Sequence, residues 1–360
     1  MIILSKLDHT NCEVRRSVLS EPVLAKQGLV DFTSSLYLGM LHPSSSLKPW
    51  SQLTTGKPGA LETAPSSGTI AGTLARLQGC ESAILLPSTL HLFFDLFAAL
   101  SRSLIAIYAD VAAYKIAFWG AERVAAHGVT LRRIRHYDPA AAQRAIAEDE
   151  RFGTRPVIVA DGFCPECGRP APLPAYLQCV IPYGGYVVLD DTQALGIWGS
   201  SPSSDRPYGS GGGGSLQLHG IRSPQVILGS SLAKGFGVPL AAICGSERIV
   251  ELFRQRSETL VHSSAPSIAL LHAAERALRI NAYQGDNLRL QLAKLVRHFS
   301  KRLRLIGLRD SEGLFPVRMI ALGREADALS LKRFLGRAAV RTAVVRGRTS
   351  ALTKLGPVVN

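Results

Sequence analysis

The chain has 360 residues, of which 46% are hydrophobic and 19% are charged, and its mean hydropathy is +0.14. This balance excludes a disordered chain and predicts a folded protein with one large core and a smaller second lobe. The formal net charge is +14, and residues 271–360 hold 18 lysines and arginines against 6 acids. Such a basic region suits phosphorylated ligands, or solvated arginine faces on helices. No recognisable nucleic-acid module accompanies it, so we expect no nucleic-acid partner.

The sequence also bears on where the protein resides. No run approaches the roughly 18 apolar residues that a membrane helix needs. The start "MIILSKLDHTNCEVRRSV" lacks the apolar region and cleavage site of a signal peptide. We therefore expect a cytoplasmic protein with no membrane partner. The six cysteines are too few and too scattered for a disulfide framework: 12, 80, 164, 167, 179 and 244.

Short apolar runs alternate with helical patterns through the middle of the chain. The runs predict seven strands, at 82–87, 103–110, 129–136, 156–162, 185–191, 225–230 and 240–246. The stretches between them predict helices at 89–101, 112–128 and 139–153. Continuous apolar strands that alternate with helices indicate an α/β protein, whose mostly parallel sheet is covered by helices on both sides.

The pattern changes after a predicted helix at 247–260. A long helix from about 267 to 305 leads to a strand at 314–322 and a helix at 325–338. We therefore predict an N-terminal arm (1–45), a large domain (46–265) and a small C-terminal α+β domain (266–360). The glycine- and serine-rich segment 200–220 predicts a flexible surface loop inside the large domain.

The segment "FCPECGRP" carries Cys164 and Cys167 at the C-x-x-C spacing of zinc and redox sites. No second C-x-x-C or H-x-x-H pair follows to complete four ligands. The pair is therefore interpreted as two ordinary loop thiols, and we expect no metal.

Several polar residues follow directly after predicted strands. Ligands of open parallel sheets bind at the carboxyl ends of the strands. An acid at one strand end and a lysine at another, 44 residues later, are what a pyridoxal phosphate enzyme requires, because the acid keeps the pyridine nitrogen protonated and the lysine forms an imine. Helix N-termini bind phosphate. The candidates are Asp190, Asp191, Ser231, Lys234, Ser88 and Thr89.

Four segments together resemble one family. The segment from "SSLAKGFGVPLAAICGS" to "SIALLHAAERAL" resembles the lysine region of the α-oxoamine synthases, the 8-amino-7-oxononanoate synthase-like enzymes of the fold-type I class I/II aminotransferase superfamily. The other three segments are "LYLGM", "DGFCPECGRPAPL" and "VVLDDTQALGIWG". The resemblance covers nearly the whole chain and implies the fold-type I architecture, with pyridoxal 5'-phosphate as cofactor and a homodimer with active sites at its interface.

The resemblance also implies residue roles. Lys234 would form the Schiff base, Ser231 would contact the cofactor phosphate, and Asp190 would pair with the pyridine nitrogen. Thr89 and Leu90, next to Ser88, would bind phosphate through backbone amides. Ser263 or Ser264 would reach the cofactor of the partner subunit, and Arg346 and Thr349 would bind the substrate carboxylate.

Three positions depart from the family pattern. Tyr114 stands where the family has a histidine stacked on the ring, and Gln193 replaces a histidine that contacts the ring hydroxyl. Pro165 replaces the family's loop serine. Tyrosine stacks as well as histidine but is a poorer acid–base group near neutral pH, and glutamine donates a hydrogen bond without changing charge. These departures indicate cofactor binding with altered chemistry.

Three functions remain open on the sequence. In the first, the enzyme condenses an amino acid with an acyl-CoA or another acyl thioester, with decarboxylation to an α-aminoketone. In the second, it is an aminotransferase on the same scaffold, which needs no thioester. In the third, it is a degenerate homologue that serves as a partner subunit, although its retention of Lys234, Asp190 and Ser231 speaks against this.

Overall fold

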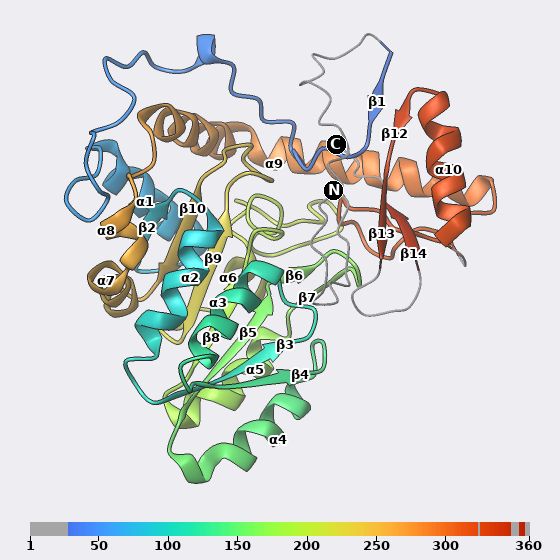
Figure 1. The fold of residues 1–360 in the computed structure, drawn as a ribbon. Coiled ribbons are helices and arrows are strands. Elements are labelled where there is room, and N and C mark those ends of the chain that lie inside the picture. The colour runs from blue at the N-terminus through green and yellow to red at the C-terminus, as the bar shows by residue number, and fades with distance from the viewer. Residues whose placement is uncertain (1–27, 323–324, 347–352, 357–360) are drawn as a thin grey trace.

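The computed structural model describes residues 28–322, 325–346 and 353–356, and its main feature is a seven-stranded sheet (Figure 1). The strand order across the sheet is β2-β10-β9-β8-β5-β3-β4. Every strand predicted for the large domain is present: β2 (Ser82–Leu86), β3 (Ile105–Asp110), β4 (Thr130–Ile134), β5 (Arg155–Asp161), β8 (Tyr186–Asp190), β9 (Val226–Ser231) and β10 (Ala241–Gly245).

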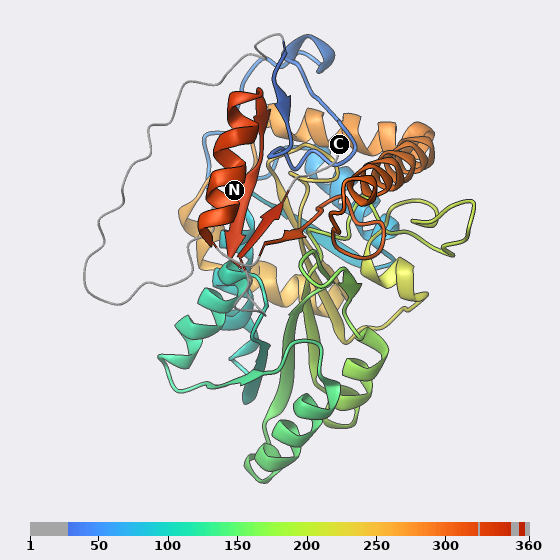
Figure 2. The ribbon, with the colours of Figure 1, turned by 90° about the vertical axis from the view of Figure 1, so that its right-hand side faces the viewer.

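Helices cover both faces of this sheet (Figures 1 and 2), because the central strands are apolar on both sides. One apolar cluster joins the sheet to α2 (Thr89–Leu100), α3 (Lys115–Ala125) and α7 (Glu247–Arg256). The other joins it to α1 (Ser66–Gln78), α4 (Pro139–Asp149), α5 (Leu173–Val180) and α9 (Ile268–Leu305). The α/β fold class and the predicted helices between the strands are confirmed. Three short 3-10 helices lie at Ser44–Ser46, Glu150–Phe152 and Ile181–Tyr183.

One strand runs against the others. The central strands pair in parallel, whereas β10 is antiparallel to both β9 and β2. Ser231 at the end of β9 pairs with Ala241 at the start of β10, so the nine residues between them form a tight connection. Lys234 lies in this connection.

The helix predicted at 247–260 is two helices. Ser257 ends α7 with an extended backbone and caps α8 (Glu258–His262), where its hydroxyl accepts a hydrogen bond from the Leu260 amide (3.1 Å). Serine is a preferred N-cap residue, and such capping starts a new helix direction.

The C-terminal region has a separate small sheet with the order β11-β14-β13 and the helix α10 (Glu325–Arg337). Its strands are β11 (Ile320–Ala321), β13 (Ala343–Arg346) and β14 (Thr353–Gly356). The N-terminal strand β1 (Val30–Asp31) pairs in parallel with β12 (Val340–Arg341), so the described part of the predicted arm lies against this region.

The strand predicted at 314–322 is only two residues long. Arg318 is 1% exposed, and its guanidinium donates to the carbonyls of Gly313 (3.0 Å) and Phe315 (3.1 Å) and to the Asp310 carboxylate (2.7 Å). The backbone before Ile320 curves around the buried guanidinium, so that its carbonyls accept these hydrogen bonds. An extended strand therefore does not form before Ile320.

The prediction of a flexible surface loop at 200–220 is wrong for its second half. Residues 201–206 are exposed, but most of 208–216 is buried and leads into α6 (Ser215–His219). Glycine at 212, with φ +70°, permits close backbone packing, and Gly212 accepts a hydrogen bond from the Gly196 amide. Buried Arg289 of α9 also donates to the Gly196 carbonyl (2.9 Å). A linker-like composition therefore serves here for tight packing.

No helix among the residues described is both long enough and apolar enough to cross a membrane.

Candidate functional site

The carboxyl ends of three neighbouring strands bring the candidate residues together. Strands β5, β8 and β9 end at Asp161, Asp190 and Ser231, and Asp161 lies opposite Asp190 in the strand register. Because the three strands are parallel, these ends share one edge of the sheet. The grouping predicted for Asp190, Ser231 and Lys234 is thus present.

Asp190 is fixed at this edge by hydrogen bonds. Its side chain is 4% exposed, and Oδ1 accepts from the Thr192 amide (2.9 Å). The Thr192 hydroxyl in turn accepts from the Ser231 amide (2.9 Å). Thr192 thus joins the ends of β8 and β9. Sequence reasoning missed it, because a threonine two residues after an acid carries no chemical signal by itself.

Asp191 has a different task from its neighbour. It is fully buried and accepts hydrogen bonds from the Ser215 amide and hydroxyl, so it holds the glycine-rich loop. Burial raises its pKa to about 7, against the opposing effect of these hydrogen bonds. Asp191 is therefore a structural residue beside the site.

Lys234 is half-buried, and its connection is pressed against two other segments. A Cβ at Gly235 would lie 2.5 Å from the Leu195 carbonyl oxygen, and one at Gly237 would lie 2.2 Å from that of Met40. Only glycine permits these approaches. The lysine is thus held on a rigid turn.

Gln193 has a partner in the "LYLGM" segment. The Tyr37 hydroxyl donates to Gln193 Oε1 (2.7 Å), which leaves the amide NH₂ as the end that donates. His42 Nε2 also contacts the Phe236 carbonyl (2.8 Å). These contacts tie residues 37–42 to the loops that carry Gln193 and Lys234.

Tyr114 lies at the start of α3, and its amide donates to Asp161 Oδ1 (2.6 Å). Burial raises the pKa of its hydroxyl, the charge of Asp190 adds to this, and a hydrogen bond with Thr89 opposes it. Tyr114, Thr89 and Asp190 are therefore neighbours. The tyrosine hydroxyl therefore keeps its proton near pH 7.

The residues predicted to bind phosphate lie at the N-terminus of α2. Ser88 is the N-cap and Thr89 the first helical residue, with Leu90 next. The first amides of a helix have no partner within the helix. The Ser88 hydroxyl lies 2.9 Å from His91 Nδ1, and His91 was not among the sequence candidates.

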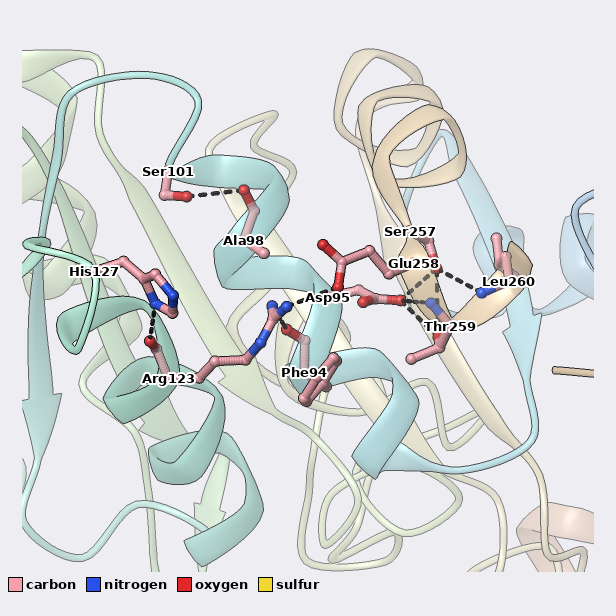
Figure 3. Close-up of polar contacts among 10 residues, drawn as sticks. All are labelled: Phe94, Asp95, Ala98, Ser101, Arg123, His127, Ser257, Glu258, Thr259 and Leu260. Atoms are coloured by element: carbon pink, nitrogen blue, oxygen red, sulfur yellow. Dashed lines mark hydrogen bonds and ion pairs between the residues drawn. The ribbon is translucent and has the colours of Figure 1, made fainter. Parts of the chain in front are cut away.

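Ser263 and Ser264 follow α8 and differ in exposure. The Ser263 hydroxyl donates to the Thr259 carbonyl (2.5 Å), whereas Ser264 is exposed and bridges to Pro58. Figure 3 shows how α8 is anchored: Asp95 of α2 reaches its first turn and accepts from the Thr259 amide (3.0 Å) and hydroxyl (2.6 Å). Ser264 is thus the serine with an exposed side chain.

The remaining predicted residues are placed less fully. Arg346 ends β13, and Thr349 lies outside the described residues. Their contact with a substrate carboxylate stays a prediction. Pro165 lies in the tight turn between β6 (Phe163–Cys164) and β7 (Arg169–Pro170), with the two cysteines of the C-x-x-C pair around it.

The sheet order and the residues at its carboxyl edge define the class of fold. The chain has the fold of the fold-type I pyridoxal phosphate enzymes, as the resemblance implied. It superimposes on Sphingomonas wittichii serine palmitoyltransferase with a TM-score of 0.78 at 16% identity, over 92% of this chain and 82% of that one. For 8-amino-7-oxononanoate synthase from Francisella tularensis the TM-score is 0.69 at 20% identity, over 93% of both chains.

Sequence comparison points to the same relatives. The chain is 30% identical to 8-amino-7-oxononanoate synthase of Methylococcus capsulatus over 231 residues, which are 62% of this chain and 56% of that enzyme. It is 29% identical to the Acidithiobacillus ferrooxidans enzyme of the same name, over 79% of this chain and 69% of the relative. The chain thus spans little more than half the length of the first of these relatives. No protein-family model matches it. The predicted resemblance to the α-oxoamine synthases is confirmed.

Proposed function

We propose that this protein is a pyridoxal phosphate-dependent acyltransferase, which condenses an amino acid with an acyl-CoA or another acyl thioester and releases carbon dioxide. The observation that carries the proposal is the convergence of a buried carboxylate, Asp190, and a held lysine, Lys234, at one sheet edge. The names of the sequence relatives support the reaction class.

The residues at this edge of the sheet fit pyridoxal phosphate. A carboxylate that is 4% exposed suits a protonated pyridine nitrogen, because a buried charge needs an opposite charge beside it. The N-terminus of α2 and the Ser231 hydroxyl suit a phosphate. Lys234 would supply the amine that holds the cofactor. When bound, pyridoxal phosphate supplies a ring that stabilises negative charge on the α-carbon of an amino acid.

The chain's own residues would do the remaining work. Lys234, once its amine is released by the incoming amino acid, would accept and return the proton at the α-carbon. Tyr114 would pack against the ring and keep its hydroxyl proton, because its pKa is raised. Gln193 would donate from its amide, since its oxygen already accepts from Tyr37.

We extend the proposal to assembly and location. Two chains would form a homodimer, in which the exposed Ser264 reaches the cofactor site of the partner. Arg346 and Thr349 would bind the substrate carboxylate, the arginine through two parallel hydrogen bonds. The scattered cysteines of the sequence support a cytoplasmic location. Light scattering of the purified chain tests the dimer, which a monomeric mass would contradict.

The function is tested on the purified holoprotein with labelled amino acids. We expect an imine absorbance band that is lost on Lys234→Ala, and carbon dioxide release that depends on both an amino acid and an acyl-CoA. Amine exchange that depends on a keto acid, with no need for a thioester, would replace the proposal by a transaminase. A chain without the imine band would be a non-catalytic homologue.

A further inference from the structure

The C-x-x-C pair lies in a turn of defined geometry. Cys164 ends β6, and the short strand β7 returns antiparallel to it. The Cys167 amide donates to Cys164 Sγ (3.4 Å), and the Gly168 amide to the Cys164 carbonyl (2.9 Å). Gly168 has φ +70°, which a side chain would disfavour. The turn is therefore held by backbone hydrogen bonds, and it brings the two sulfur atoms within 4.8 Å of each other.

A third ligand-type group completes a cluster that the sequence did not reveal. His136 follows β4 and brings its Nε2 to 3.3 Å from Cys167 Sγ. One ring nitrogen of His136 and both sulfur atoms all lie within 4.8 Å of one another. Tetrahedral zinc bound to two sulfurs and one nitrogen requires separations of about 3.8 Å between the sulfurs and about 3.6 Å from sulfur to nitrogen. The cluster therefore has nearly the size of a zinc site.

Asp110 and Tyr137 fix the orientation of the His136 imidazole. Asp110, 1% exposed at the end of β3, contacts His136 Nδ1 with its two carboxylate oxygens (2.9 and 3.1 Å). The Tyr137 ring stacks on the imidazole, with centroids 3.9 Å apart. A carboxylate on one ring nitrogen turns the other toward a metal and raises its basicity, as at many zinc centres.

We propose that Cys164, Cys167 and His136 form a zinc site, with the fourth position of the metal taken by water or another ligand. The expectation of no metal rested on the neighbours of the pair in the sequence, whereas His136 stands 31 residues before Cys167. The site is separate from the residues proposed to hold pyridoxal phosphate, and its existence does not depend on that proposal.

A bound metal would stabilise the loops next to the proposed cofactor site. Tyr137, stacked on the His136 ring, donates its hydroxyl to the Asp161 carbonyl (2.8 Å), and the Asp161 carboxylate holds the Tyr114 amide (2.6 Å). A metal would thus join the turn after β5 to the segment after β4 and fix the backbone from which Tyr114 projects.

The test uses the full chain, purified without chelators and analysed for metal by mass spectrometry. We expect roughly one zinc per chain. After exchange for cobalt we expect the intense thiolate-to-cobalt charge-transfer absorption and the visible bands of tetrahedral coordination. His136→Gln and Cys167→Ser are expected to lower the zinc content to below about a tenth of the wild-type value. Cys80→Ser, a half-buried cysteine outside the cluster, is the matched control and keeps the zinc.

The test uses variants of His136 and Cys167 and none of Cys164, because Cys164 is fully buried and its replacement can impair folding. Circular dichroism of each variant establishes that it is folded. A wild-type chain that takes up neither zinc nor cobalt overturns the proposal, and so does zinc retained by both variants. Formation of a Cys164–Cys167 disulfide under mild oxidation, in a chain without metal affinity, overturns it too and identifies a redox pair. None of these results depends on cofactor binding or turnover.

Discussion

Two groups of polar residues share one edge of the sheet, and they differ in how their partners are spaced along the chain. Asp190 and Ser231 end the consecutive, paired strands β8 and β9, Lys234 follows three residues later, and all three match the family pattern. Around β3, β4 and β5, Asp110, His136 and the two cysteines come from three separate segments of the chain. The first group can be recognised from the sequence, whereas the second becomes visible only in the fold.

The largest expected effect separates the two groups. Lys234→Ala removes the amine that would hold the cofactor and move the α-proton, so we expect turnover to fall by about a thousandfold or more. The zinc content should stay at the wild-type value, because Lys234 does not belong to the group that contains His136 and the two cysteines. Activity assays and metal analysis of the same preparation check this, and loss of both would show that the two groups form a single site.

The second effect concerns the other group. Asp110→Asn weakens the hold on His136 Nδ1, and we expect zinc affinity to fall by about 10- to 100-fold. The absorbance of bound pyridoxal phosphate should change little. Competition with a chromogenic chelator measures the affinity. Asp149→Asn is the matched control, since Asp149 is also a buried carboxylate but pairs with Arg132 (2.6 Å) and Tyr108 (3.0 Å). An equal loss of affinity in the control would contradict a positioning role for Asp110.

A third effect tests the link between β8 and β9. Thr192→Val keeps the side-chain shape but removes the acceptor of the Ser231 amide, so we expect the free energy of unfolding to fall by about 1–3 kcal/mol. Urea denaturation measures this change. Thr342→Val is the control: among the residues described, the buried Thr342 hydroxyl has no hydrogen-bond partner, so its removal should cost little. Equal losses in the two variants would argue against the link.

The last effect, spread over several pH units, distinguishes the two adjacent aspartates. The folded state keeps the Asp191 proton up to a pKa of about 7, whereas the unfolded chain releases it near 3.8. The folded state therefore binds more protons between these pH values, and the contribution of Asp191 to stability falls as pH rises, by up to about 1.4 kcal/mol per unit. Asp191→Asn cannot ionise, so the slope of stability against pH should become less negative across this window. An unchanged slope would mean that Asp191 is ionised when folded.

The sequence predicted several features correctly because they depend on local pattern. The seven strands follow from apolar runs of strand length, and the place of Asp190 and Lys234 follows from where those runs end. The helix break at Ser257 was missed because both halves share one periodicity, and it is Asp95, distant in sequence, that accepts from the start of the second half. The packing of residues 208–216 was missed because buried Arg289 comes from α9.

The sequence by itself determined the fold class and the position of the lysine turn, since burial of an apolar strand and the steric freedom of glycine are properties of a few consecutive residues. The tertiary structure alone decided what lies beside that turn: Thr192 between two strand ends, Tyr114 next to Thr89, and His136 at the thiols. These contacts join residues that are far apart along the chain, and only the first of them links neighbouring strands, since β2 and β3, and likewise β4 and β5, are not adjacent in the sheet. They depend on how the loops and helices pack at the sheet edge, which is set by the whole fold rather than by any local pattern.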